Sequence, residues 1–149
     1  MRILITGCNG QLGNEMRVQS IQHPRHEYLY ADIVQPENSP VEVHRLDITD
    51  RDAVHHFVQE QRIDLIVNCA AYTNVDKAEE DEMTARKINA EAVENLGTAG
   101  CRLIHISTDY VFSGDEHVPC REDDSVAPRT AYGRTKWEGE ERLHKVNPA

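Results

Sequence analysis

The chain has 149 residues, 39% of them hydrophobic, which is enough for one domain with a sizeable core. Its 26 acidic and 16 basic residues give a formal net charge of −10, and no Lys/Arg cluster favours a nucleic-acid or anionic-membrane surface. No apolar run approaches the roughly 20 residues of a membrane span, and residues 1–6 enter an apolar strand without the features of a signal peptide. We therefore expect a soluble, cytoplasmic protein that binds neither nucleic acid nor membrane.

Cysteine and histidine spacing indicates neither a disulfide framework nor a metal site. The four cysteines (Cys8, Cys69, Cys101 and Cys120) form no CxxC pair, and three of them lie in or beside apolar runs. The eight histidines include no HExxH arrangement. We expect buried free thiols, solvated or locally packed histidines, and no metal ligands among these residues.

Apolar strand-like runs alternate with amphipathic helix-like runs along nearly the whole chain. The predicted strands cover residues 2–6, 27–33, 41–47, 63–70 and 101–107, and such runs suit strands buried on both faces of a parallel sheet. Helical spacing of apolar residues predicts helices over residues 51–62, 82–99 and 131–146. This order predicts an α/β fold with a Rossmann-type doubly wound parallel sheet, and residues 113–130 should form an ordered surface loop.

The first predicted strand leads directly into three glycines that precede a helix. Their GxxGxxG spacing differs from the GxGxxG dinucleotide motif, but a tight turn and a close approach of backbone to pyrophosphate exclude side chains in the same way. The helix N-terminus would present free N–H groups to the phosphates. We therefore predict that a dinucleotide binds at Gly7, Asn9, Gly10, Gln11, Leu12 and Gly13.

Acidic residues close the second and third predicted strands. Asp32 lies 19 residues after Gly13, where a carboxylate can hydrogen-bond an adenosine ribose and would repel a 2′-phosphate, which favours NADH over NADPH. Its alternative role is that of a turn residue at a strand end. Asp47 and Ile48 can flank the adenine, and the alternative for Asp47 is to cap the next helix.

Ligands of open α/β sheets bind outside the carboxyl ends of the strands. The fourth predicted strand ends there in "NCAAY", whose small residues permit close approach, and the fifth ends in "STDYVFSG". The last predicted helix places Tyr132 and Lys136 four positions apart on one face, where the ammonium makes the phenol a usable proton donor near neutral pH. With Thr108 holding a substrate oxygen and reduced nicotinamide supplying hydride, these residues would form a carbonyl reductase site. The alternative is an ordinary surface Tyr/Lys pair.

With these motifs assembled, the chain resembles the extended short-chain dehydrogenase/reductase superfamily and, within it, the dTDP-4-dehydrorhamnose reductase family. The resemblance rests on "GCNGQLG", "VNCAAYTNVDKAEED", "KINAEAVENL", "HISTDYVFSG" and "YGRTKWEGE", and it runs from Met1 to about Val146. It implies reduction of the C4 ketone of dTDP-4-dehydro-L-rhamnose to dTDP-L-rhamnose. The residues that it implies are Thr108, Tyr132 and Lys136 for catalysis, Thr108, Asp109, Tyr110 and Tyr132 for the substrate, and Asn68, Ala70, Ala71, Tyr72 and Lys136 for the cofactor.

The resemblance also implies NADH or NADPH as cofactor, a dTDP-sugar as substrate and, in a full-length form, a homodimer and Mg²⁺. Members of this family continue for about as many residues again, with a C-terminal sugar-nucleotide-binding region. We therefore expect residues 1–149 to form the NAD(P)-binding domain that carries the catalytic residues, without that region. Two alternatives stay open: another sugar-nucleotide reductase, epimerase or dehydratase of the superfamily, and a non-catalytic NAD(P)-binding regulatory subunit like the methionine adenosyltransferase beta subunit.

Overall fold

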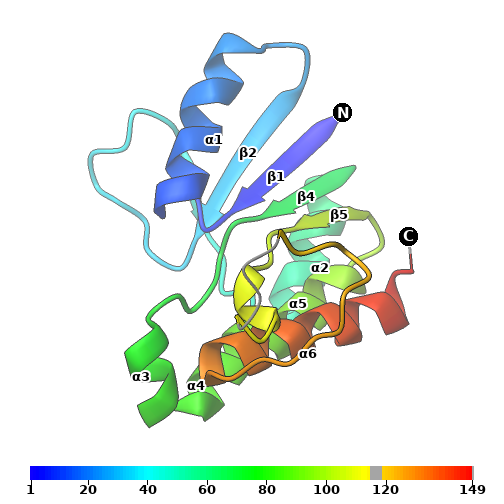
Figure 1. The fold of residues 1–149 in the computed structure, drawn as a ribbon. Coiled ribbons are helices and arrows are strands. Elements are labelled where there is room, and N and C mark those ends of the chain that lie inside the picture. Colours follow the sequence, from blue (N-terminus) through cyan, green and yellow to red (C-terminus); the bar gives the residue numbers. More distant parts are fainter. Residues whose placement is uncertain (115–118, 149) are drawn as a thin grey trace. The chain divides into compact units, whose positions relative to one another are not determined.

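Five short strands pair in parallel in the computed structural model of the chain, which describes residues 1–114 and 119–148. They are β1 (Arg2–Thr6), β2 (Glu27–Asp32), β3 (Val43–Arg45), β4 (Leu65–Asn68) and β5 (Arg102–His105), in the order β3-β2-β1-β4-β5 (Figure 1). The predicted Rossmann-type parallel sheet is confirmed. The strands after β1 are shorter than the apolar runs that predict them, because a strand extends only as far as its backbone is paired with a neighbour.

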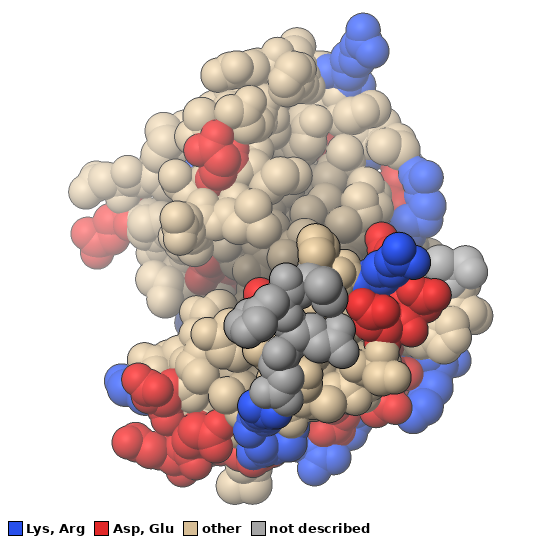
Figure 2. All heavy atoms as spheres, viewed as in Figure 1, with Lys and Arg blue, Asp and Glu red and all other residues tan. Residues whose placement is uncertain are grey.

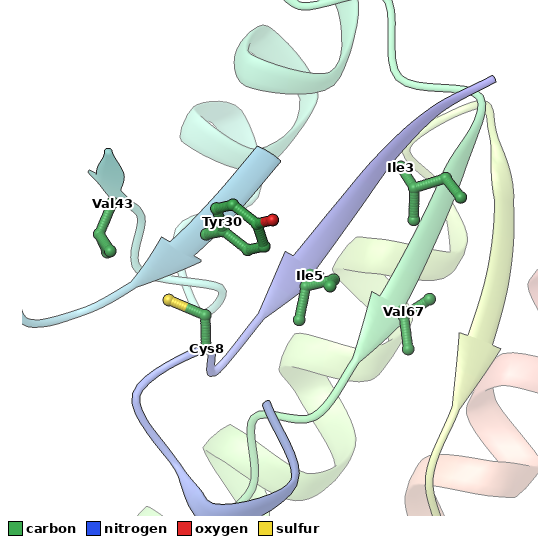
Figure 3. Close-up of a cluster of buried hydrophobic side chains, with 6 residues drawn as sticks. All are labelled: Ile3, Ile5, Cys8, Tyr30, Val43 and Val67. Carbon is green, nitrogen blue, oxygen red and sulfur yellow. The ribbon is translucent and has the colours of Figure 1, made fainter. Parts of the chain in front are cut away.

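One face of the sheet carries a cluster of buried side chains. Met16 of α1 (Gln11–Gln22) packs against this cluster, and the hydroxyls of Ser20 and Tyr30 hydrogen-bond at 2.7 Å, so the buried phenol has a polar partner. Each buried aliphatic side chain contributes on the order of 1.5–3 kcal/mol to folding. The buried members, shown in Figure 3, are Ile3, Ile5, Cys8, Tyr30, Val43 and Val67.

Helices α1 and α2 (Arg51–Glu60) lie on opposite faces of the sheet, as right-handed crossovers between parallel strands require (Figure 1). Helix α2 begins at an Asp50 cap, whose carboxylate accepts a hydrogen bond from the Ala53 backbone N–H at 3.0 Å. Val54 and Val58, one turn apart, are buried on its inner face. Helix α2 therefore begins directly after the capping residue Asp50, and its apolar residues follow from the first turn onward.

The chain packs into two compact units, each described separately below. The first comprises residues Met1–Ala71 and Asn95–Ile106, and it contains the whole sheet. The second comprises Tyr72–Glu94 and the chain from Ser107 onward, and it is helical. The prediction of one NAD(P)-binding domain over residues 1–149 remains a prediction.

The second unit is built around its longest helix, α6 (Ala131–Val146), whose bounds agree with the predicted range. Thr130 caps α6 by accepting a hydrogen bond from the Gly133 N–H at 3.0 Å. Helices α3 (Val75–Glu80) and α4 (Glu82–Arg86) lie beside it (Figure 1). The short 3₁₀-helix η2 (Asp109–Val111) also packs on α6.

The single helix predicted over residues 82–99 is interrupted. After α4 the chain forms a π-helical turn, η1 (Lys87–Glu91), and then α5 (Ala92–Gly97). Asn89, inside η1, is buried, and its side-chain amide bonds the backbone of Tyr72 and the Thr135 hydroxyl. The π turn reorients this residue among its neighbours, which a regular helical repeat does not predict.

Charged side chains of both signs lie interspersed on the surface of the second unit (Figure 2). Arg142 pairs with Glu94 at 2.6 Å and with Glu138 at 2.9 Å, and Arg86 also reaches Glu138, at 2.8 Å. Such surface pairs contribute about 0–1 kcal/mol each, so they do not by themselves determine how α6 is placed. Across residues 1–114 and 119–148, no helix combines the length and apolar character needed to cross a membrane.

Two glycines of α6 bring its backbone into direct contact with neighbouring segments. A Cβ added at Gly133 would overlap the carbonyl oxygen of Tyr110, and a Cβ at Gly139 would overlap the carbonyl oxygen of Asn89. Both obstacles are backbone atoms, which cannot move aside as a flexible side chain can. Glycine is therefore required at these positions for the observed packing against η2 and η1.

Replacing Gly139 with alanine should lower the free energy of unfolding by about 1–3 kcal/mol, because the added methyl group must separate α6 from η1. Urea unfolding followed by circular dichroism measures the change. Glu141→Ala, at an exposed position of the same helix, should change stability by no more than about 0.5 kcal/mol. Equal stability of the two variants would contradict the close contact.

Candidate active site

The glycine turn between β1 and α1 is shaped by positions that admit no side chain. Gly7 has a φ of +66°, and a Cβ there would lie 2.6 Å from the backbone of Ala70. A Cβ at Gly13 would overlap the carbonyl oxygen of Gly7. Gly10 occupies the N-cap of α1 without a side-chain hydrogen bond, so no side-chain cap competes there with an anion for the first N–H groups.

The other predicted residues of this turn, Asn9, Gln11 and Leu12, are exposed, as is Gly10. Asp32, at the end of β2, lies against the turn: its carboxylate accepts hydrogen bonds from the N–H groups of Asn9 (3.0 Å) and Val34 (3.2 Å). The Asn9 side-chain amide also donates to the Val34 carbonyl at 2.7 Å. Asp32 therefore organises the turn, and its charge lies beside the predicted ribose position.

Asp47 and Ile48, after β3, occupy different environments. Asp47 is exposed, and its carboxylate accepts from the N–H (2.9 Å) and hydroxyl (2.8 Å) of Thr49. The alternative that Asp47 caps the next helix is wrong, because Asp50 fills that position. Ile48 is buried in the core, so its side chain does not form an exposed wall at this edge of the sheet.

Asn68 links three strands at their carboxyl ends. Its side-chain oxygen accepts from the Thr6 hydroxyl at 2.7 Å and from the Ala70 N–H at 3.2 Å, while its amide nitrogen lies 3.0 Å from His105 Nδ1. The side chain is only 1% exposed. Asn68 therefore positions the chain that leads into Ala70 and Ala71, both half-buried, and does not itself form an exposed contact surface.

Cys8, within the glycine turn, is an inert thiol at neutral pH. Burial and, to a lesser extent, the negative charge of Asp32 raise its pKa to about 11. The four cysteines are free, but only Cys8 is fully buried: Cys69 and Cys101 are half-buried and Cys120 is exposed. Of the three cysteines in or beside apolar runs, the expected full burial is confirmed for Cys8, whereas Cys69 and Cys101 are only partly buried.

Helix α6 in the second unit carries Tyr132 and Lys136 on successive turns. Lys136 is only 1% exposed, so the alternative of an ordinary surface pair is excluded for this residue. Burial lowers the pKa of Lys136 to about 8, and the carboxylate of Glu140 acts against this shift. Tyr132 is half-buried, and its ring meets that of Tyr110 edge-on, with centroids 5.5 Å apart.

Thr108, Asp109 and Tyr110 lie on the segment that packs against this part of α6. The Thr108 hydroxyl accepts from the Tyr110 N–H at 3.2 Å, which caps η2, and it lies 3.3 Å from the Asp109 carboxylate. Asp109 and Tyr110 are exposed. The ring of Tyr110 thus contacts the ring of Tyr132, and Thr108 lies at the start of η2, the short helix that contains Tyr110.

Tyr72 belongs to the same unit and is held by a residue that sequence reasoning missed. The Asn89 side-chain oxygen accepts from the Tyr72 N–H at 2.8 Å, and its amide donates to the Tyr72 carbonyl at 3.1 Å and to the Thr135 hydroxyl at 3.2 Å. Tyr72 and Tyr132 pack against one cluster of buried alanines. The available signal was an asparagine within an otherwise apolar helical stripe.

Helix α6 therefore carries a tyrosine hydroxyl and a buried ammonium group on successive turns. A buried lysine whose pKa is lowered is typical of functional sites. Within the described ranges, no three His, Cys, Asp or Glu side chains are grouped as a metal site would require.

The chain is similar over nearly its whole length to known proteins of one family. The family model described as "RmlD substrate binding domain" matches residues 1–149. A probable dTDP-4,6-dihydroxy-2-methyloxan-3-one 4-ketoreductase of Streptomyces antibioticus is 42% identical over 99% of this chain and 48% of its own length. A dTDP-4-dehydrorhamnose reductase of Aggregatibacter actinomycetemcomitans is 36% identical over 99% of this chain and 48% of its own length.

A crystal structure of a dTDP-4-dehydrorhamnose reductase from Clostridium acetobutylicum superposes with a TM-score of 0.88 at 43% identity, over 99% of this chain and 50% of that one. That of the Bacillus anthracis dTDP-4-dehydrorhamnose reductase in complex with NADP gives a TM-score of 0.86 at 36% identity, over 98% of this chain and 50% of that one. The chain thus spans about half the length of the relatives it matches. The family model that matches residues 1–149 confirms the resemblance seen in the sequence. The chain belongs to the RmlD substrate binding domain family.

Proposed function

We propose that the chain provides the cofactor-binding and catalytic part of a reductase that converts dTDP-4-dehydro-L-rhamnose to dTDP-L-rhamnose with NADH or NADPH. The observation that carries this proposal is the buried Lys136 ammonium one helical turn from Tyr132. Burying an ammonium group is costly, and a fold retains such a group where its charge is used.

Tyr132 is the proton donor in this proposal. Its hydroxyl gives a proton to the C4 carbonyl oxygen, and Lys136 stabilises the phenolate that remains, because a nearby cation favours the charged form of a phenol. Thr108 donates a hydrogen bond to the same oxygen, and Asp109 and Tyr110, which are exposed, contact the sugar. The C4 ketone thereby becomes a hydroxyl, and solvent returns a proton to Tyr132.

A nicotinamide dinucleotide, when bound, supplies the hydride that reaches C4. The glycine turn suits its pyrophosphate, because Gly7 and Gly13 have no room for a Cβ and Gly10 leaves the start of α1 without a side-chain cap. Asp32 would bond the adenosine ribose. Asn68 acts in this proposal by positioning Ala70 and Ala71 next to the cofactor. Asp47 and Tyr72 are proposed to contact the cofactor as well.

The Asp32 carboxylate favours NADH in this proposal, although the relative from Bacillus anthracis was solved with NADP. A homodimer and a requirement for Mg²⁺ are proposed from the family resemblance alone, and a cytoplasmic location is proposed from the sequence composition. A second candidate function is 4-keto reduction of a different dTDP-sugar, which the name of the Streptomyces antibioticus relative favours. Both candidates use the same proton donor and differ in the sugar.

Titration of the chain with NADH and NADPH, followed by fluorescence, tests the cofactor half of the proposal. We expect saturable binding that is stronger for NADH, and Asp32→Asn should weaken NADH binding about 10-fold by removing a charged hydrogen-bond acceptor. Asp52→Asn, an exposed carboxylate in the first turn of α2, is the matched control and should bind as the parent does. A folded sample that binds neither cofactor would overturn the proposal.

Oxidation of NADH on addition of dTDP-4-dehydro-L-rhamnose, read by absorbance, tests the reaction. Tyr132→Phe should abolish turnover and keep cofactor affinity within about 3-fold, because it removes only the proton donor. Turnover that persists in this variant would exclude Tyr132 from that role. Tight cofactor binding without turnover by the parent chain would leave the cofactor half of the proposal standing, and a longer protein would then be needed to separate a reductase from a non-catalytic, regulatory function.

The buried cation should make stability depend on pH in a defined window. Because the folded pKa of Lys136 is about 8, below its ordinary value, the folded state binds fewer protons than the unfolded chain between about pH 8 and 10.4. The cost, roughly 3 kcal/mol, is fully present below pH 8 and disappears as the pH rises through this window.

Lys136→Met should therefore raise the free energy of unfolding at pH 7, and the gain should vanish near pH 10.4. Urea unfolding of both proteins at pH 7 and near pH 10 measures the difference. Lys145→Met, at an exposed position of α6, is the control and should show no such pH dependence. A Lys136→Met gain that is the same at both pH values would argue against a buried charge.

A further inference from the structure

The segment that follows β5 is attached to α6 at two points on either side of Lys136. Toward the start of the helix, Gly133 lies against the carbonyl oxygen of Tyr110. Nearer its end, the hydroxyl of Ser107 donates a hydrogen bond to the carboxylate of Glu140. Gly133 and Glu140 are two helical turns apart, roughly 10 Å along the axis. The segment carrying Thr108 therefore lies along the part of α6 that contains Lys136.

Glu140 is also placed to act on Lys136 directly. It lies one helical turn after Lys136, a spacing at which side chains of a helix are neighbours. Its negative charge raises the pKa of Lys136, opposing the larger lowering by burial. One carboxylate thus interacts with the docked segment and with the buried cation.

Several charged groups on the elements packed around α6 pair with residues other than Lys136. Arg86 and Arg142 share Glu138, and Arg142 also pairs with Glu94. From α3 and α4, Glu79 and Glu82 pair with Arg134, and from η2, Asp109 contacts Thr108. The acidic group whose charge acts on Lys136 is instead Glu140, which lies on α6 itself.

We propose that Glu140 and Ser107 form a positioning pair: Glu140 supplies the countercharge that keeps Lys136 an ammonium, and its bond to Ser107 holds the Thr108 segment against α6. Ser107 was expected from the sequence only to lie at the ligand-binding edge of the sheet, and Glu140 was not expected to take part in the site. The relevance of this pair to catalysis rests on the reductase function proposed above. Its two physical effects do not, and they can be measured without substrate or cofactor.

Two substitutions separate the effects. Glu140→Gln removes the charge but keeps an oxygen that can accept from Ser107, whereas Ser107→Ala keeps the charge and removes the donor. Glu141→Gln removes the same charge one position further along the helix and is the matched control. Glu140→Asp restores the charge on a shorter side chain and serves as the conservative rescue.

The chain has four lysines, Lys77, Lys87, Lys136 and Lys145, so a ¹³Cε-lysine NMR titration resolves each one in the intact 149-residue protein. Glu140→Gln should lower the pKa of Lys136 by about one unit, Glu140→Asp should recover part of this loss, and Glu141→Gln should leave it unchanged. The other three lysines serve as internal references. A Lys136 titration that is the same in Glu140→Gln and Glu141→Gln would overturn the countercharge role.

Amide hydrogen exchange tests the attachment of the segment. Ser107→Ala should speed exchange at Tyr110 and Phe112, whose N–H groups bond within η2, by roughly 5-fold or more, and Glu141→Gln should not. Unchanged exchange in Ser107→Ala would overturn the attachment role. Because both measurements omit the cofactor, failure of NADH binding would contradict the proposed function and leave this test intact.

Discussion

Direct backbone contact at glycine positions is the constraint on which both parts of the candidate site depend. In the first unit, Gly7 lies against Ala70, and Gly13 lies against Gly7, which sets the turn before α1. In the second unit, Gly133 and Gly139 allow α6 to lie against η2 and η1. A single methyl group at these positions would separate the backbones, so the placement of the polar groups beside them follows from the absence of side chains.

The buried ammonium of Lys136 is the second organising feature, and it opposes folding rather than favouring it. The other buried residues of α6 are small. Lys136 is the largest fully buried side chain among the residues that the structure describes. Glu140 offsets part of the desolvation. A buried charged group that lowers the stability of the fold is expected where the group is retained for its chemistry.

The candidate functional residues are divided between the two units. The glycine turn, Asp32 and Asn68 belong to the unit that contains the sheet, whereas Tyr72, Thr108, Tyr132 and Lys136 belong to the helical unit. The relatives named for 4-keto chemistry on dTDP-sugars are about twice as long as this chain, which agrees with a proposal that assigns to these residues the proton chemistry rather than the choice of sugar.

The sequence by itself determined the parallel sheet, the glycine turn and the Tyr132/Lys136 face of α6, because apolar periodicity, glycine spacing and helical repeat are local properties. The tertiary structure decided the rest. It buried Lys136 and Ile48, turned Asn68 inward toward His105, and interrupted a predicted helix at Asn89. It also paired Ser107 with Glu140, 33 positions apart. These features depend on which distant segments meet, and a polar side chain in a sequence does not reveal its partner until the backbone brings the two together.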